Sequence, residues 1–371
     1  MTDTTGTARA SPAPLSHCWC GNAQLLSYSA DYRLCAHCKT LVSSRAFAPD
    51  LVEVNDEGQD LYGLNYFYEH AKELSQPDLG ARAHLDLAER CVHWLKALLE
   101  FRPPPARTLE LGCASGAFVG ALTSAGYQAT GQDLSPAVTA RAAETFGVPV
   151  LSGPLETQDL PDASLDVLIL MDVVEHLIDP LATLGTGARI LRDDGLLMIQ
   201  MPNFNPALSH EDLLQTEGPF LVQMKADEHI FLYSRESATA LLSRLGFEHV
   251  VFLPAIFSMY DMYFVASRTP ISRVDEAVWR NALRRSREGR MMEALIDNFT
   301  GNQAGILLKH RLDQVEVDRA RRLEVILEQQ QQLAQQQERG RQQDLELDHL
   351  RKAKLERVVA AIESRLKPGT R

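Results

Sequence analysis

The chain has 371 residues, which exceeds one average domain and suits a core domain with appended segments. Its 45% hydrophobic residues indicate a globular protein, and its formal net charge of −12 argues against a general nucleic-acid binder. No stretch approaches the roughly 18 apolar residues of a membrane span, and the polar start has no signal-peptide core, so we expect a cytoplasmic protein.

The chain is expected to begin with a disordered stretch, residues 1–16, that is rich in Thr, Ala, Ser and Pro. Residues 17–47 then hold four of the six cysteines, and in a reducing compartment such a cluster binds metal more often than it forms disulfides. Four thiolates suit a structural zinc ion, which would supply the folding energy that so short a segment cannot gain from a core. The predicted ligands are Cys18, Cys20, Cys35 and Cys38.

The first cysteine pair leaves alternatives open because its C-x-C spacing is tighter than the usual C-x-x-C. His17 or His37 could replace one cysteine as a ligand, and unpaired thiols or a redox pair are two further interpretations. A catalytic zinc is disfavoured, since four protein ligands leave no open coordination position.

The segment 48–84 is acidic at first and then aromatic, with Tyr62, Tyr66, Phe67 and Tyr68 close together. One interpretation is a helix that packs its aromatic face on the core. The other is a helical lid over a site, with a tyrosine hydroxyl that reaches a substrate. Apolar residues at helical spacing then predict a helix from His84 to Phe101.

The sequence RTLELGCASG at 107–116 predicts a strand over 108–111, a glycine-bearing turn, and a helix over 117–125. Such a turn lets a ligand approach the backbone closely. Glu110 precedes the turn, and its carboxylate suits the cationic methionyl part of S-adenosylmethionine better than a pyrophosphate. A dinucleotide fingerprint would also need glycine where Ala114 and Ala117 stand.

Strands and helices alternate after this turn, which predicts a parallel sheet with right-handed crossovers. Asp133 ends the second strand, where a carboxylate can hold a ribose diol. A helix capped by Ser135 and a short strand over 148–151 follow, and the apolar LDVLILMD then reads as a doubly covered strand. His176, shortly after that strand, either positions or deprotonates an acceptor or braces the loop.

Four segments, RTLELGCASG, ATGQDLSP, LDVLILMDVVEHLIDP and DGLLMIQMPN, together resemble the class I S-adenosylmethionine-dependent methyltransferases. The resemblance covers about residues 85–268 and is strongest to bacterial enzymes that act on sugars, surface polysaccharides and quinone precursors; it departs at Ala114, where the middle glycine of the turn is usual. It implies an α/β fold with a Rossmann-like core and a mostly parallel seven-stranded sheet, carrying a small N-terminal zinc module and a long C-terminal helix or coiled coil.

The resemblance and the strand ends together predict the cofactor site. Leu155 and Glu156 are placed against the adenine by the resemblance. The full predicted set is Glu110, Gly112, Cys113, Ala114, Ser115, Gly116, Asp133, Leu134, Leu155, Glu156, Met171 and Asp172.

The acceptor side is expected after the fifth strand, where the insertion 203–225 should shape a pocket. In sugar methyltransferases with a cysteine module, a Glu-His pair at the place of Glu228 and His229 looks like the acid/base pair, and the resemblance implies the same role here. The tyrosine-rich segment resembles a lid that covers the active site, which favours Tyr66. A bracing role for His229 in the turn remains the alternative.

A helix starting at Ser234 and stopping near Gly246 and two antiparallel strands are predicted to complete the core by residue 268. Residues 269–305 should form a helical linker. Residues 306–371, rich in Gln and Arg, predict an imperfect coiled coil or a solvated single helix, for self-association or docking onto a partner enzyme.

The predicted function is methyl transfer from S-adenosylmethionine to a sugar, as a nucleotide sugar or surface glycan, at oxygen or carbon, with a histidine base. An O-methyltransferase acting on a quinone or another small molecule is the first alternative. A non-catalytic assembly factor that uses the zinc module and the coiled coil is the second.

Overall fold

The computed structural model describes residues 13–47, 53–73 and 77–302, together with a few isolated residues after 340. It divides into one unit that ends at Thr300 and a second unit, Gly301–Arg371. The predicted coiled coil lies outside the described residues. Within the part of the chain that is described, no helix is long and apolar enough to cross a membrane.

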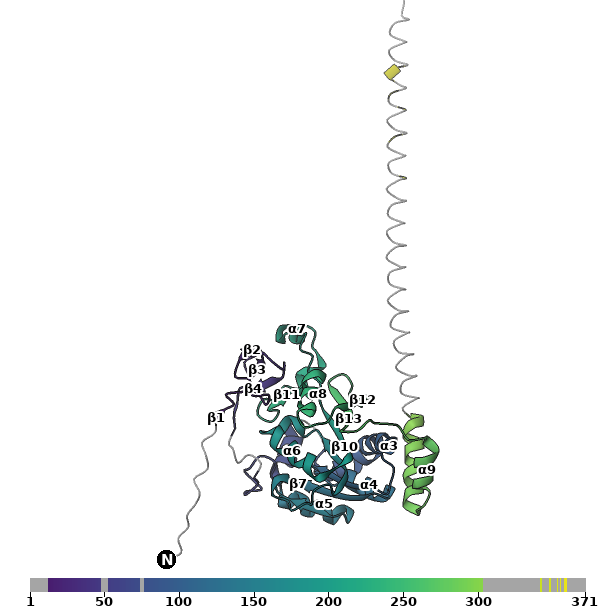
Figure 1. Cartoon of the computed structure of the whole chain (residues 1–371). Coiled ribbons are helices and arrows are strands. Elements are labelled where there is room, and N and C mark those ends of the chain that lie inside the picture. Colours follow the sequence, from purple (N-terminus) through teal and green to yellow (C-terminus); the bar gives the residue numbers. More distant parts are fainter. Residues whose placement is uncertain are drawn as a thin grey trace, which may run out of the picture. The chain divides into compact units, whose positions relative to one another are not determined.

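A seven-stranded sheet forms the centre of the first unit, in the order β12-β13-β10-β9-β6-β7-β8 (Figure 1). Every pair from β10 to β8 is parallel, and β13 runs antiparallel to both of its neighbours. The strands are β6 (Arg107–Leu111), β7 (Gln128–Asp133), β8 (Val150–Ser152), β9 (Leu165–Met171), β10 (Leu191–Pro202), β12 (His249–Leu253) and β13 (Asp261–Ser267). The predicted Rossmann-like arrangement, mostly parallel with two antiparallel strands at its end, is confirmed.

The strands lie where the apolar runs predicted them because both faces of this sheet are covered. β9 is buried from Val167 to Met171, as its near-continuous apolar sequence requires. β10 begins at Leu191, earlier than its apolar run. The polar residues near its start are exposed, so they extend the strand without adding to the apolar pattern. The predicted strand over 148–151 is shifted to Val150–Ser152.

Helices connect the strands and begin at the caps that the sequence suggests. Ser135 accepts a hydrogen bond from the Val138 amide at the start of α5, and Ser234 caps α8 in the same way. α8 ends at Ser243, and Gly246 follows with φ +85°. The helices that alternate with the strands are α4 (Ala117–Ala125), α5 (Pro136–Phe146), α6 (Pro180–Ile190) and α8 (Arg235–Ser243).

The segment before β6 is helical over a longer range than predicted. α1 (Leu64–Glu73) comes first, and α2 (Leu79–Asp86) continues through a π-helical turn, η1 (Leu87–Cys91), into α3 (Val92–Leu99). The expected border between the aromatic segment and the methyltransferase-like region, at residue 84, therefore falls inside a helix. The apolar face starts earlier because Leu79 and Ala83 are buried.

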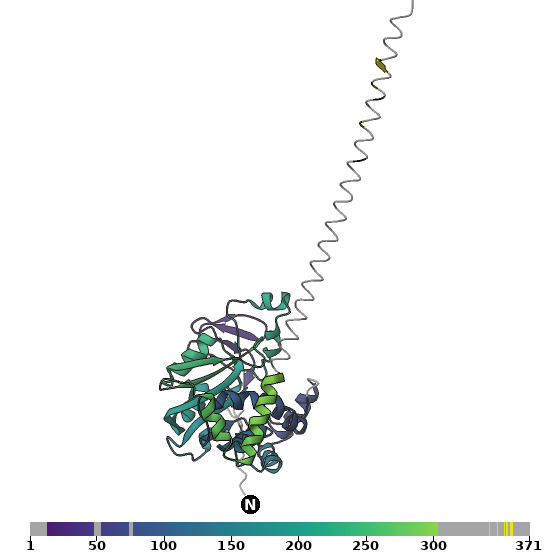
Figure 2. The ribbon, with the colours of Figure 1, turned by 90° about the vertical axis from the view of Figure 1, so that its right-hand side faces the viewer.

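The segment expected to be a linker packs against the core instead. α9 (Glu276–Leu283) and the helical residues 287–300 bury Trp279, Leu283 and Ile296 in the same apolar cluster as Leu95 and Leu98 of α3. Figure 2 shows this bright-green helical segment beside the dark-blue helices that precede β6. Apolar residues at helical spacing have a face to bury, so the segment belongs to the domain.

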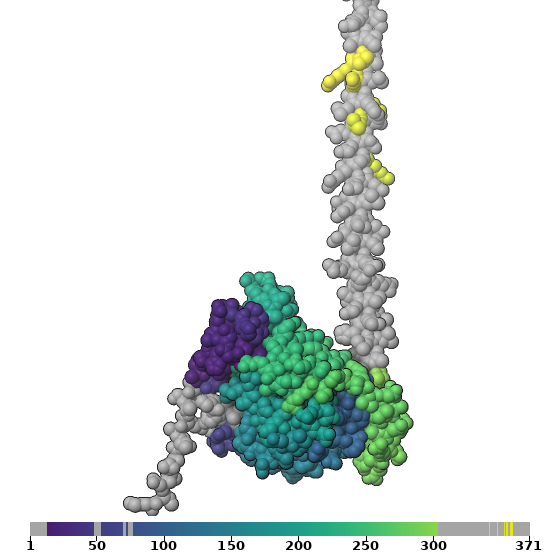
Figure 3. Space-filling model, in the orientation of Figure 1, coloured from purple at the N-terminus to yellow at the C-terminus, as the bar shows by residue number. Residues whose placement is uncertain are grey.

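The N-terminal cysteines lie in a second sheet, ordered β11-β4-β3-β2. Its strands are β2 (Leu25–Ser27), β3 (Tyr32–Cys35), β4 (Leu41–Ser43) and β11 (Phe231–Leu232). Tyr32 and Leu41 are buried in one cluster with Phe204 and Phe220 from the insertion after β10. Figure 3 shows this N-terminal module, in purple, against the green segment that follows β10.

The expectation of disorder from residue 1 to 16 needs one correction. Residues 1–12 lie outside the described part of the chain, but β1 (Ala13–Pro14) pairs antiparallel with β5 (Ala46–Phe47). Arg33 also donates a hydrogen bond to the Leu15 carbonyl, at 2.8 Å. The last residues of this segment are therefore attached to the cysteine module.

Candidate active site

The turn after β6 has the backbone geometry of a ligand-binding loop. Gly112 and Gly116 have φ of +72° and +77°, and Ala114 has φ +43°. A Cβ at Gly112 would lie 2.7 Å from Cγ2 of Val173, so glycine is needed there for space as well as for conformation. Ala114 keeps a left-handed conformation despite its Cβ, which makes it a strained residue at a functional turn.

The end of β7 holds this turn in place. The Gly112 and Cys113 amides both donate to the Gln132 carbonyl, at 2.8 and 3.0 Å. The Ala114 amide donates to Oδ2 of Asp133, at 2.9 Å. Asp133 therefore organises the turn in addition to lying where a ribose would be held.

Two buried carboxyl groups give the turn its electrostatic character. Glu110 is 5% exposed, and its Oε2 has no hydrogen-bond partner among the described residues. Burial, and then the charge of Asp133, raises the pKa of Glu110. Burial also raises the pKa of Asp133, to about 6, against the lowering effect of its backbone hydrogen bonds. An unpartnered buried carboxylate fits a ligand that brings a cation or a donor.

The remaining predicted cofactor residues divide into two groups. Cys113, Ser115, Leu155 and Met171 are buried, and Leu134 is half-buried beside Asp133. Glu156 is exposed, and its carboxylate accepts a hydrogen bond from Thr183 of α6. Asp172, with φ +57°, forms an ion pair with Arg90 at 3.6 Å and accepts from Gln200 at 3.0 Å. The side chains of Glu156 and Asp172 therefore have partners within the protein.

The predicted acid/base residues come together from three separate segments. Tyr66 donates a hydrogen bond to Oε2 of Glu228, at 3.2 Å. His176 Nδ1 lies 3.0 Å from the Glu228 carbonyl and 3.1 Å from the hydroxyl of Tyr62. The rings of His176 and His229 meet edge to face, with centroids 4.9 Å apart. His176 and Glu228 are 52 residues apart in sequence and Tyr66 and Glu228 are 162 apart, yet the fold brings all four predicted side chains to one place.

The hydrogen bond of His229 determines its tautomer. His229 is 5% exposed, and its Nδ1 lies 2.7 Å from the Gln223 carbonyl. A carbonyl only accepts, so the bound proton is on Nδ1 and the lone pair of the neutral ring is on Nε2. This is the arrangement that a histidine base requires.

Two residues of this cluster were missed in the sequence. Glu175 is 1% exposed, its Oε2 has no partner among the described residues, and burial raises its pKa. One ligand atom each of Glu175, His176 and His229 lies within 4.8 Å of the others. Tyr62 has a left-handed φ of +70° and a pKa raised by burial. The aromatic segment had drawn attention, but only side-chain directions distinguish Tyr62 from Tyr66.

Glu57 connects the predicted lid segment to the cofactor turn and was also missed. Its Oε2 accepts from the Leu64 amide, at 2.7 Å, and from the Ser135 hydroxyl, at 2.6 Å. Its Oε1 accepts from the Ala137 amide, at 2.9 Å. Burial alone would raise the pKa of Glu57, but these hydrogen bonds outweigh burial and lower it. One carboxylate thus caps the first turns of both α1 and α5.

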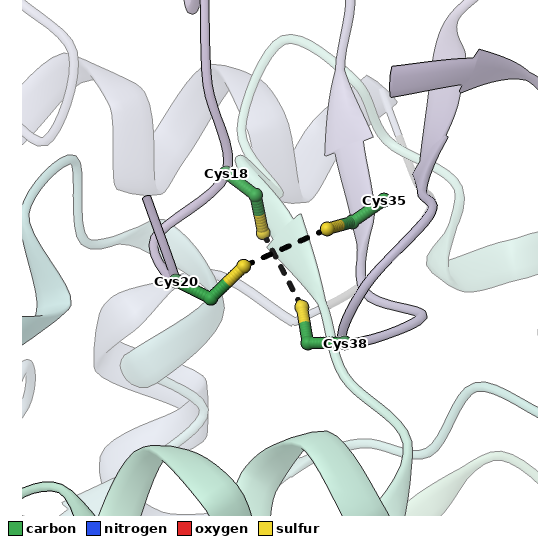
Figure 4. Close-up of side chains that lie close together, drawn as sticks. All are labelled: Cys18, Cys20, Cys35 and Cys38. Carbon is green, nitrogen blue, oxygen red and sulfur yellow. Dashed lines mark hydrogen bonds between the residues drawn. The ribbon is translucent and has the colours of Figure 1, made fainter. Parts of the chain in front are cut away.

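The four cysteines face one another from two loops of the N-terminal module (Figure 4). The Sγ atoms of Cys18 and Cys38 are 3.5 Å apart, and those of Cys20 and Cys35 are 3.6 Å apart. All four sulfur atoms lie within 4.8 Å of one another. Among the described residues, the group includes both cysteines of the tight C-x-C pair and neither His17 nor His37. A histidine substitute is therefore not needed to complete four donors.

A cavity of about 420 Å³ lies in the insertion after β10, where an acceptor pocket was expected. Phe204, Phe220 and Met259 supply apolar surface, and Asn203 and Asn205 supply amide groups. The lining side chains within the described residues carry no formal charge. The cavity suits a neutral, partly apolar group.

Comparisons with known proteins agree with this geometry. Residues 82–251 match a family described as a methyltransferase domain. A Mycobacterium tuberculosis protein named as a probable S-adenosylmethionine-dependent methyltransferase is 34% identical over 96 residues, which are 26% of this chain and 35% of that protein. The ubiquinone biosynthesis O-methyltransferase of Cereibacter sphaeroides is 32% identical over 105 residues, which are 27% of this chain and 42% of that protein.

The matches cover less than half of either curated relative. Among solved structures, the magnesium protoporphyrin IX methyltransferase of Synechocystis aligns with a TM-score of 0.40 and 16% identity, over 56% of this chain and 98% of that chain. The likeness to methyltransferases is in the family match and in the sheet topology. Residues 82–251 thus match a methyltransferase-domain family, and they include most of the seven-stranded sheet.

Proposed function

We propose that this chain transfers a methyl group from S-adenosylmethionine to an oxygen or carbon of a sugar, carried as a nucleotide sugar or a surface glycan. The observation that carries the proposal is a pair of features at the carboxyl edge of the central sheet. The first is the glycine turn after β6, where Oε2 of buried Glu110 has no partner among the described residues, and the second is the buried imidazole of His229, which lies against His176 after β9 and has its tautomer fixed.

The residues around the turn fit this cofactor. Oε2 of Glu110 has no hydrogen-bond partner among the described residues, which suits the cationic methionyl group. Gly112 allows close backbone approach, and the carboxylate of Asp133 can accept from ribose hydroxyls. When bound, the cofactor supplies a methyl group already activated on a sulfonium.

The chain's own task is then to orient the acceptor and to remove its proton. His229 accepts that proton on Nε2, while the Gln223 carbonyl holds the proton on Nδ1. Glu228 and Tyr66 form a hydrogen-bonded pair beside it that can orient acceptor hydroxyls. His176, bonded to the Glu228 carbonyl, braces the same loop. The cavity after β10 would take the neutral part of the acceptor.

Methylation of a quinone precursor or other phenol is the second candidate. It is favoured by the similarity to a protein named ubiquinone biosynthesis O-methyltransferase and by the aromatic lining of the cavity. The cluster of His229, Glu228 and Tyr66 favours the sugar instead, since several hydroxyls need several polar partners. An assembly factor without turnover has no use for this cluster.

We also propose that Cys18, Cys20, Cys35 and Cys38 bind one structural zinc ion. Zinc–sulfur bonds of about 2.3 Å place tetrahedral sulfur atoms about 3.8 Å apart, close to the 3.5 and 3.6 Å of the two measured pairs. Metal analysis of freshly purified protein should find about one zinc per chain. Less than half an equivalent in well-folded protein would contradict the zinc proposal.

The function is tested first by calorimetric titration with S-adenosylmethionine, beside an Asp133→Ala control. Binding that the control loses supports the cofactor site. Methyl transfer is then followed with labelled cofactor on nucleotide sugars and, in parallel, on catechols. Transfer to catechols alone would overturn the sugar proposal. If folded wild-type protein does not bind S-adenosylmethionine, the proposal that the chain is a methyltransferase is overturned.

A further inference from the structure

The loop that carries Glu228 and His229 is attached to the N-terminal cysteine module. Strand β11, which begins two residues after His229, pairs antiparallel with β4 in the second sheet. Phe231 lies opposite Val42, and Leu232 lies opposite Leu41. The acid/base loop therefore continues directly into a sheet whose other three strands come from the first 43 residues.

Two buried side chains of the module hold the backbone of this loop. The Tyr32 hydroxyl donates to the His229 carbonyl, at 2.9 Å, and the Ser43 hydroxyl donates to the Ala226 carbonyl, at 2.7 Å. The Ser43 amide also donates to the Ile230 carbonyl, at 2.9 Å. Tyr32 and Ser43 are both fully buried, so no water replaces these donors in the folded protein.

These bonds act on the part of the loop that orients the imidazole. The His229 amide donates to the Lys225 carbonyl, at 2.7 Å, and Nδ1 of its ring lies at the Gln223 carbonyl. The backbone of residues 223–229 thus surrounds one side of the His229 imidazole, and the hydrogen bond from Tyr32 holds the backbone of His229 itself. A displacement of about 1 Å at a reacting group can cost about 100-fold in rate.

Two of the four cysteines, Cys35 and Cys38, lie at the end of β3 and in the turn that leads to β4, the two strands that supply the donors. β3 begins at Tyr32 and ends at Cys35, while β4 ends at Ser43 and follows Cys38 closely. Their register pairs Tyr32 with Ser43 directly. A rigid arrangement of the four thiols therefore holds this hairpin, and the hairpin holds the loop.

We propose that Tyr32 and Ser43 are positioning residues for His229, so that the cysteine module forms part of the active site. The inference rests on the proposed role of His229 as the base. It predicts that the two hydroxyls affect turnover and leave cofactor binding unchanged, because neither reaches the turn after β6.

The experiment uses full-length protein with Tyr32→Phe, Ser43→Ala and the double variant. Tyr28→Phe is the matched control for kcat, because its hydroxyl, in the same module, donates at 3.2 Å to the carbonyl of Leu208, which lines the cavity after β10 and lies outside the His229 loop, so that this variant can change only the KM for the acceptor. We expect kcat to fall about 10-fold or more in Tyr32→Phe, further in the double variant, and less than twofold in the control. Affinity for S-adenosylmethionine and metal content should remain those of the wild type.

A double-mutant cycle distinguishes positioning from general stabilisation. In a His229→Asn background, Tyr32→Phe should cause no further loss of kcat, since the hydroxyl acts through the histidine. Wild-type kcat in all variants overturns the inference. Loss of cofactor affinity in step with kcat, or an undiminished loss in the His229→Asn background, also overturns it.

Hydrogen exchange provides a readout that does not need activity. Amides of residues 225–232 should exchange faster in Tyr32→Phe than in Tyr28→Phe, and unchanged exchange overturns the inference. If wild-type protein transfers no methyl group to any acceptor, the proposed function fails. Faster exchange in Tyr32→Phe would still show that the module holds this loop.

Discussion

The cofactor turn and the acid/base cluster illustrate two ways of building a site. The turn between β6 and α4 is formed by consecutive residues, and its shape follows from glycine conformations and from bonds to the adjacent strand β7. The cluster combines side chains from the aromatic segment 62–68, the turn after β9, the loop before β11 and the N-terminal sheet. A local motif therefore forms the proposed cofactor site, while the tertiary fold brings the proposed acid/base residues together.

The difference predicts how each part should fail. Changes in the turn should remove cofactor binding together with activity, since the backbone of the turn forms the proposed cofactor site and activity requires bound cofactor. Changes in the cluster should lower turnover and leave cofactor binding intact, since its residues lie on other segments. The following predictions test this separation, starting from the largest expected effect.

His229→Asn should lower kcat by about 10²–10⁴-fold because the base is lost. The affinity for S-adenosylmethionine should stay within about twofold of the wild type. Single-turnover methyl transfer and calorimetry measure the two quantities separately. His249→Asn, on the edge strand β12, is the control and should behave like wild type. Wild-type turnover by His229→Asn would remove the proposed base.

Gly112→Ala should weaken cofactor binding by about 10-fold or more. Its Cβ would meet Val173 at 2.7 Å, and its φ is +72°. Gly147→Ala is the matched control, because Gly147 has φ +65° and no atom within 4 Å of the added Cβ. Both variants should lose about 1 kcal/mol of unfolding free energy from backbone strain, and only Gly112→Ala should lose the cofactor. Equal cofactor affinities in the two variants would contradict a close approach at Gly112.

Cofactor binding should weaken as the pH falls through about 6. The pKa of Asp133 is raised to about 6 by burial, and ribose hydroxyls that donate to it favour the charged form. Bound cofactor therefore lowers this pKa, binding releases a proton, and affinity falls by up to about tenfold per pH unit below 6. Calorimetry in two buffers of different ionisation enthalpy measures the proton release.

The variant Asp133→Asn distinguishes titration of Asp133 from titration of Glu110, whose pKa is also raised. The variant should bind weakly at every pH and should lose the step near pH 6. The stability of the cofactor-free protein should depend on pH in the opposite direction to cofactor affinity. Because the pKa of Asp133 is higher in the folded than in the unfolded state, this group stabilises the fold at pH values below its unfolded pKa, and the contribution is lost as the pH rises through about 6. A pH step that persists in Asp133→Asn would assign the titration to another group.

Glu57→Gln should have the smallest effect, about 1 kcal/mol of unfolding free energy and a few-fold rise in the KM for S-adenosylmethionine. The carboxylate caps two helices, and the amide keeps only part of its acceptor capacity. Glu53→Gln, an exposed residue of the same segment, is the control. A change in kcat without a change in KM would place Glu57 with the acid/base cluster rather than with the turn.

Much of this protein was predictable from local patterns. The strand, turn and helix around Glu110 follow from apolar runs and glycine positions, and Ser135 and Ser234 cap their helices as predicted. The cysteine spacing likewise indicated four converging thiols, and they converge. These features succeed because consecutive residues and their backbone conformations determine them.

Other features depended on contacts between distant segments. Glu57 looked like one acid in an acidic stretch, and only the fold brings it to the first turn of α5. Tyr32 lies between the two cysteine pairs with no sequence signal of its own, and only the pairing of β4 with β11 brings its hydroxyl to His229. α9 was read as part of a linker until its apolar face was found in the core.

The amino-acid sequence by itself indicated the alternating strands and helices of the core and the cofactor turn, because short-range geometry encodes them, and the family resemblance supplied the acid/base candidates. The tertiary structure alone decided which segments surround His229 and how its ring is held. The physical reason is that a hydrogen bond between residues 32 and 229 depends on how two distant chain segments pack. The periodicity of the sequence carries no information about the distance in space between such segments.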